Sequence, residues 1–148
     1  MGVISSIDTW LLRLHQRLVD WSQRPPLWWV EQSGYALGTF ALLDAGLRGA
    51  DHLARDAMAA LSLVVNLTFA AAAITSSRRP AFARNLIGGE IFRKIVLAMF
   101  LVLAPWLLRA NPVGLMERIA FICVLYFWIC QPPRPRRRRQ AARRTAVA

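Results

Sequence analysis

Three carboxylates and one imidazole lie between positions 44 and 56, and together they could bind a cation or transfer a proton. They are Asp44, Asp51, His52 and Asp56. His52 and Asp56 are four positions apart, so they would share one face of a helix. An imidazole beside a carboxylate can shuttle a proton or ligate a metal ion. Because no second histidine and no glutamate stands nearby, we interpret these residues as a solvated turn beside the membrane.

The other reactive residue types form no catalytic pattern. Cys123 and Cys130 are seven positions apart, about 10 Å along a helix axis, which is too far for a disulfide within one helix, so we interpret them as packing residues. The sequence contains no glycine-rich phosphate loop, nucleophile elbow, HExxH or CxxC pattern. We therefore expect no catalytic residues, no metal site and no cofactor, and we expect that the protein is not an enzyme.

The composition predicts a membrane protein. Of the 148 residues, 56% are hydrophobic, the mean hydropathy is +0.36, and the formal net charge of +11 is concentrated near the C-terminus. This combination excludes a disordered chain, a disulfide scaffold and an ordinary water-soluble enzyme domain. We expect an all-α membrane protein with an N-terminal amphipathic helix at the interface, a small bundle of transmembrane helices and a disordered basic tail.

Residues 1–26 are predicted to form the amphipathic helix, on the cytoplasmic side. Apolar residues recur with helical spacing, and Pro25 and Pro26 end the pattern. We expect this helix to lie in the headgroup region; the alternatives are packing on a soluble partner or on the rest of this chain. The apolar positions are Ile7, Trp10, Leu11, Leu14, Leu18 and Trp21.

Residues 27–131 are predicted to form the transmembrane domain, with spans at about 34–50, 57–75, 92–109 and 113–131. The first span is the weakest because it contains Asp44, so a three-span protein with a re-entrant or interfacial first segment is the alternative. Four spans with both termini inside leave few basic residues outside, which the positive-inside rule favours. Those few are Arg48, Arg55, Arg109 and Arg118, of 19 in total.

Small and polar residues on the first two spans are predicted to form helix-packing or oligomer contacts, since membrane helices associate through close packing and a few polar contacts. Asn66, near the middle of an uncharged span, needs a hydrogen-bond partner, either in this chain, in another copy, or locally at Ser62. The predicted contact residues are Gly38, Ala41, Ala45, Gly49, Ser62, Asn66 and Ala70.

Two further groups of residues, the interface anchors and the arginines of the C-terminal tail, are expected to contact the lipid bilayer and its anionic headgroups. The predicted interface anchors are Trp10, Trp21, Trp28, Trp29, Arg93, Lys94 and Arg109. The Arg/Pro-rich tail, residues 132–148, is predicted to bind anionic lipid and fix the topology through Arg134, Arg136, Arg137, Arg138, Arg139, Arg143 and Arg144. Nucleic acid is not the expected partner, because no aromatic residue interleaves with these arginines.

These patterns favour a small polytopic protein of the plasma membrane, the bacterial inner membrane, with both termini cytoplasmic. We expect a non-enzymatic structural or accessory subunit that packs against a second copy or another membrane protein. A holin-like pore-forming or lysis protein is the first alternative, consistent with the small size, short spans and basic tail. A small transporter or membrane enzyme that uses Asp44, Asp51, His52 and Asp56 is the second.

Overall fold

The computed structural model describes residues 2–75 and 90–130, and all regular structure within these ranges is helical. The all-α prediction is therefore confirmed for the described residues. The predicted tail lies outside them. The helices, in chain order, are α1 (Gly2–Ser22), α2 (Pro26–Arg48), α3 (Ala50–Arg55), α4 (Ala57–Ile74), α6 (Glu90–Ala110) and α7 (Pro112–Ile129).

Local sequence signals set the helix boundaries. Pro26 occupies the first turn of α2, where its missing N–H costs no hydrogen bond, so the helix starts earlier than the predicted span at 34–50. Gly49 ends α2 with a φ of 83°, a conformation that favours glycine. The side chain of Asp56 caps α4 by accepting hydrogen bonds from the amides of its first turn. Asn111 caps α7 in the same way, through the amide of Gly114.

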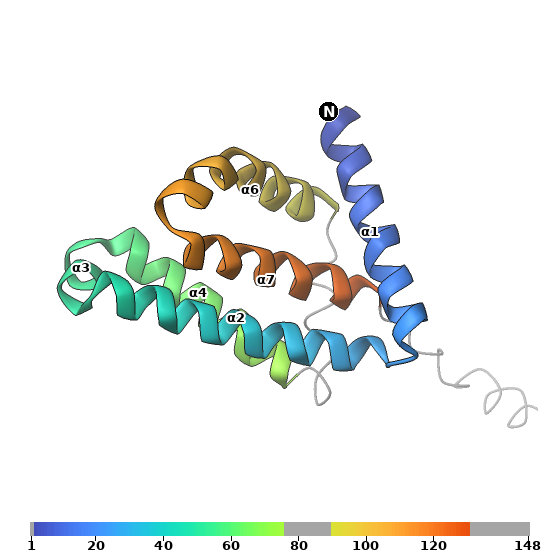
Figure 1. The fold of residues 1–148 in the computed structure, drawn as a ribbon, viewed down its shortest axis with the longest axis horizontal. Helices are drawn as coiled ribbons and strands as arrows, with labels where there is room; N and C mark the ends of the chain where they lie inside the picture. The colour runs from blue at the N-terminus through green and yellow to red at the C-terminus, as the bar shows by residue number, and fades with distance from the viewer. Residues whose placement is uncertain (1, 76–89, 131–148) are drawn as a thin grey trace, which may run out of the picture.

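Four helices lie alongside one another, and α1 crosses them steeply at one end (Figure 1). At this α1 end, α2 and α6 begin and α7 ends; at the opposite α3 end, α2 leads through α3 into α4. Helix α2 packs against both α4 and α7, whereas α6 packs against α7 and α1. The chain thus passes back and forth between the same two ends of the bundle.

The core is centred on the second half of α7. Five consecutive residues, Val124 to Trp128, are all buried, so this part of α7 is covered on every face. Helices α1, α2 and α6 all pack against α7. Burial on every face explains why the sequence of α7 shows no amphipathic period there.

Three helices, α4, α6 and α7, are long and apolar enough to cross a membrane. This supports a membrane location. The windows in α4 and α6 bury only 17% of their residues inside the chain, against 56% for α7. Helix α2 is longer, with 23 residues, but is interrupted by Glu31, Asp44 and Arg48 and is not among the three.

The inward face of α1 matches the predicted one only in part, since Leu11 and Leu18 pack against the core as predicted. The residues that α1 buries are Asp8, His15 and Val19, whereas the predicted apolar residues Trp10 and Trp21 stay exposed. Asp8 and His15 lie on the packed side of α1 because each has a partner there: Arg93 on α6 bonds Asp8, and Tyr126 on α7 stacks on His15. The prediction that this segment is helical agrees with the structure, and its contacts with α6 and α7 match the alternative in which it packs on the rest of the chain.

Candidate functional site

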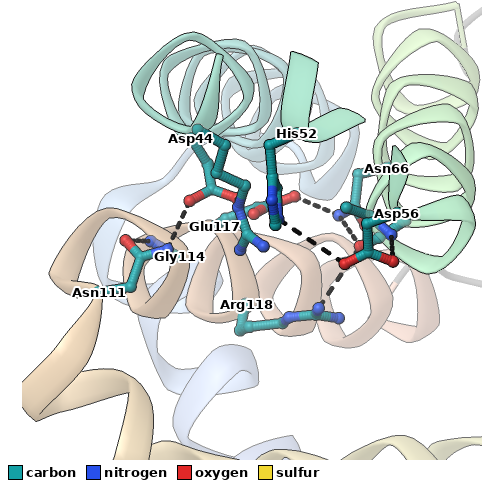
Figure 2. Close-up of polar contacts among 11 residues, drawn as sticks. Asp44, His52, Asp56, Asn66, Asn111, Gly114, Glu117 and Arg118 are labelled. Carbon is teal, nitrogen blue, oxygen red and sulfur yellow. Dashed lines mark hydrogen bonds and ion pairs between the residues drawn. The ribbon is translucent and has the colours of Figure 1, made fainter. Parts of the chain in front are cut away.

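Asp44 is the centre of a polar cluster inside the bundle near the α3 end (Figure 2). Arg48, one turn later on α2, donates from Nε to Asp44 Oδ2 at 2.8 Å. Asn111, at the start of α7, donates from Nδ2 to Asp44 Oδ1 at 2.6 Å. Both oxygens of the buried carboxylate are therefore bonded, and Asp44 ties α2 to the first turn of α7.

Glu117 and Asn66 form a second buried contact beside it. Asn66 Nδ2 on α4 donates to Glu117 Oε1 on α7 and also lies 3.4 Å from Ser62 Oγ. Figure 2 shows the two side chains directed toward one another from separate helices. Arg118 reaches the same Ser62 hydroxyl at 3.4 Å. The partner that Asn66 requires thus lies within the chain, on a helix that starts 46 positions later in the sequence.

Several side chains of the two contacts line a cavity of about 460 Å³ between α2, α4, α6 and α7: Asp44, Arg48, Ser62, Glu117 and Arg118. Asp44, Arg48, Asp56, Glu117 and Arg118 supply charges of both signs, and the rest of the lining is mainly apolar. Of the four residues considered as candidates for cation binding or proton transfer, Asp44 and Asp56 line this cavity, whereas Asp51 and His52 do not.

His52 and Asp56 lie at the surface. Their side chains are about half exposed, and His52 Nε2 is 3.7 Å from Asp56 Oδ2. Asp51 is exposed on the short helix α3. Within the described ranges no three His, Cys, Asp or Glu side chains come close enough together to hold a metal ion. This arrangement is that of a solvated turn whose acid also caps α4.

Sequence reasoning missed the partners from α7. The sequence pattern does not indicate Asn111 or Glu117, and it marks Arg118 only as one of the few outer basic residues. The signal was present, because buried Asn66 in an uncharged helix and a carboxylate among apolar residues each require a partner. What the sequence lacks is the register that brings α4 against α7.

A second polar cluster, at the α1 end, joins three helices. Arg93 on α6 donates to both carboxylate oxygens of Asp8 on α1, at 3.2 and 3.0 Å. The hydroxyl of Tyr126 on α7 donates to Asp8 Oδ1 at 2.7 Å. Burial alone would raise the pKa of Asp8, but these hydrogen bonds and the charge of Arg93 lower it below its usual range.

His15 lies one helical heptad after Asp8 and faces the same way. Its ring stacks on Tyr126 and meets Phe127 edge to face, with centroids 5.3 and 4.6 Å apart. Its Nδ1 is 2.8 Å from the carbonyl oxygen of Leu11. Burial lowers the pKa of His15, because a charged imidazolium is disfavoured among apolar neighbours, although the contact with Leu11 opposes this.

No family model, curated protein or solved structure matches this chain. The roles of the two clusters follow from their geometry.

The predicted small-residue contacts lie mainly between α2 and α4. Ala41 and Ala70 are buried, and Gly38 lies where an added Cβ would be 3.5 Å from Ala70 Cβ. Both Ala41 and Ala45 line the polar cavity, and Gly49 forms the turn after α2 with open space around it. The structure thus uses this stripe, up to Ala41, within one chain.

The predicted interface anchors fall into two groups. Trp10, Trp21, Trp28 and Arg109 are exposed. Trp29 packs on Phe127 and donates from Nε1 to Ser22 Oγ at 2.9 Å; Arg93 is paired with Asp8 and Lys94 with Glu90. The tail arginines Arg134 to Arg144 lie outside the described residues.

Proposed function

We propose that this chain is a four-span protein of the bacterial inner membrane, with α2, α4, α6 and α7 crossing the bilayer and both termini in the cytoplasm. Helix α2 supports this because it packs between α4 and α7 and extends between the same two ends of the bundle (Figure 1). Its 23 residues give a length of about 35 Å, enough for the hydrocarbon core. Its interrupting Asp44 is turned into the bundle and paired there.

The distribution of charge supports the orientation. With the α1 end in the cytoplasm, only Arg48, Arg55, Arg109 and Arg118 of the 19 basic residues are left toward the outer side. Helix α1 then lies steeply across the cytoplasmic end of the spans, with Trp10 and Trp21 exposed for the headgroup region. A three-span protein would add Arg13, Arg17 and Arg24 to the outer side.

Two single-cysteine variants decide between these topologies. On a background in which Cys123 and Cys130 are replaced by alanine, Gly2→Cys and Ala50→Cys are labelled in whole cells with an impermeant maleimide. Four spans put position 50 outside and position 2 inside, so only Ala50→Cys is labelled. If both positions are labelled from outside, α2 does not cross the membrane and the four-span topology is wrong.

We further propose that the protein is a non-enzymatic structural or accessory subunit. The observation that carries this is the open apolar surface of α6, which packs mainly on α7 and α1 within the described part of the chain. Its exposed side chains include Met99, Val102 and Trp106. The buried charged groups, by contrast, are used within the chain as ties between helices. In a bilayer such a surface faces either lipid or the helix of a second copy or of another membrane protein, and we propose the latter.

A photo-crosslinking amino acid at Val102 tests this, with Thr9 on the exposed side of α1 as the matched control position. We expect a protein adduct from Val102 that also shifts the band in blue-native electrophoresis, and none from Thr9. Adducts to lipid alone, with a strictly monomeric band, would overturn the subunit proposal.

A small transporter is the second candidate, because Asp44 and Glu117 line a cavity rather than facing lipid. Proton or cation flux into liposomes should then fall with the double variant Asp44→Asn, Glu117→Gln and remain with His52→Ala, since His52 lies outside the cavity. Equal flux from empty liposomes and from liposomes that contain the protein would remove this candidate.

A further inference from the structure

A large apolar groove lies between α1, α2, α6 and α7, separate from the polar cavity. Its volume is about 730 Å³, within the range of about 300–1,000 Å³ typical of small-molecule sites. The walls are almost entirely apolar and rich in aromatic rings, among them Trp10, Trp29, Phe100 and Phe127. Such walls fit a neutral apolar molecule.

His15 brings one hydrogen-bonding group to this groove. Its Nδ1 contacts the carbonyl oxygen of Leu11, which can only accept, so Nδ1 carries the proton and Nε2 is an acceptor. Among the described residues Nε2 has no partner. It is also not sealed, because the one fully buried side-chain N or O atom left unbonded in residues 2–75 and 90–130 is Trp128 Nε1. His15 is 5% exposed and lines the groove, so its Nε2 can accept a hydrogen bond from a donor on a molecule in the groove.

Ser33 on α2 adds a second polar group. Its side chain lines the same groove and is over nine-tenths buried, and within the described part of the chain its hydroxyl makes no hydrogen bond. A continuous aromatic wall lies beside these groups: His15 contacts Phe127, and Phe127 stacks on Trp29 with centroids 5.0 Å apart. A flat ring can stack on such a wall.

We propose that this groove binds a hydroquinone with an apolar tail, its phenolic hydroxyl donating a hydrogen bond to Nε2 of His15. The hydroxyl supplies the donor that the imidazole lacks, the ring matches the aromatic wall, and the tail fills the apolar remainder of the groove. A phosphodiester group offers only acceptors, and an ammonium group would lose its hydration among apolar walls. A helix from a second copy has its backbone donors already bonded, so it could meet Nε2 only through a side-chain donor.

A ligand pair tests the proposal on the unaltered protein. Binding of a short-tailed hydroquinone is compared with that of its dimethyl ether, which keeps the ring and tail but cannot donate. We expect the ether to bind about three- to tenfold more weakly, as for one lost neutral hydrogen bond. In ¹⁵N spectra of histidine-labelled protein, the hydroquinone should move the Nε2 signal of His15 and leave that of His52, which is remote on α3, unchanged.

The variant His15→Phe keeps an aromatic ring and removes the acceptor. We expect it to bind hydroquinone and ether alike, whereas His52→Phe retains the preference. Equal binding of the two ligands to the unaltered protein, or an unmoved His15 signal on saturation, would overturn the proposal. So would displacement of bound hydroquinone by phosphatidylglycerol or by diacylglycerol at equal concentration, because the groove would then be a general lipid site.

Discussion

Arg93 and Asp8 meet through two parallel hydrogen bonds, from Nε and Nη2 of the guanidinium to the two oxygens of the carboxylate. The residues are 85 positions apart and belong to α6 and α1. The hydroxyl of Tyr126 on α7 completes the group. A crossing helix is thus held on the bundle by a fixed polar geometry as well as by apolar contact, and this orients α1 relative to the four long helices.

Replacing Asp8 by alanine should loosen α1. The change leaves the guanidinium of Arg93 buried without its partner, so we expect a loss of about 2–3 kcal/mol in the free energy of unfolding. Denaturant titration in detergent, followed by far-UV circular dichroism, measures it. Asp20→Ala is the matched control, since Asp20 is an exposed acid on the same helix, and it should change the stability by less than about 0.5 kcal/mol. Equal effects from the two variants would contradict the role of the Asp8–Arg93 pair.

Acidification should weaken the packing of α1 on the bundle in two steps, the first at His15 and the second at Asp8. The pKa of His15 is lowered from its ordinary value of 6.5 by burial, so the unfolded chain takes up this proton first. Stability is therefore full above pH 6.5 and falls as the pH drops below it. The pKa of Asp8 is also lowered, from 3.8, so its contribution is present above that value and is lost as the pH falls further.

The measurement is the free energy of unfolding as a function of pH, with His15→Phe as the comparison. The variant should lack the first decline and keep the second, because only the imidazole is removed. A stability that is constant between about pH 7 and pH 5 in the unaltered chain would show that His15 is not held neutral by its burial.

The sequence predicts the helices well but not the face that each presents. Periodicity predicts the apolar stripe of α1, and its Leu11 and Leu18 pack against the core. Trp10 and Trp21 of the same stripe stay exposed, however, and the structure buries Asp8 and His15. Hydrophobic pattern alone cannot reveal this, because the preference comes from Arg93 and from partners on α7. The register between distant helices decides which polar groups become buried.

The polar cluster near the α3 end shows the same limit. Asp44 and Asn66 each stood out as polar residues in apolar helices, and the sequence correctly indicated that Asn66 needs a partner. That Glu117 fills this role follows only from the packing of α4 against α7. The sequence shows that Asp44 and Asn66 each need a polar partner, but it does not show which residue that partner is.

Asn66 should tolerate an amide in place of the carboxylate of Glu117. Glu117→Gln keeps an acceptor oxygen for Asn66 Nδ2, so we expect a change below about 0.5 kcal/mol, whereas Glu117→Ala removes the contact and should cost about 1–2 kcal/mol. Thermal unfolding in the same detergent compares the two. An equal loss for the two variants would mean that the negative charge, which both remove, stabilises the bundle rather than the hydrogen bond.

Gly34 and Gly38 give the sharpest test of how α2 packs on α4. An added Cβ at Gly34 would lie 2.7 Å from Ala73 Cβ and 3.1 Å from the Ala70 carbonyl oxygen, and neither atom can move without shifting α4. We therefore expect Gly34→Ala to destabilise the protein by about 1–3 kcal/mol through overpacking. At Gly38 the nearest atom, Ala70 Cβ, would be 3.5 Å away, which is ordinary contact, so Gly38→Ala should be neutral or slightly stabilising through its higher helix propensity. Both variants lie on one face of one helix and add the same methyl group, so their unfolding free energies in one detergent isolate the closeness of approach. Equal values for the two would show that α2 and α4 are not in contact at Gly34.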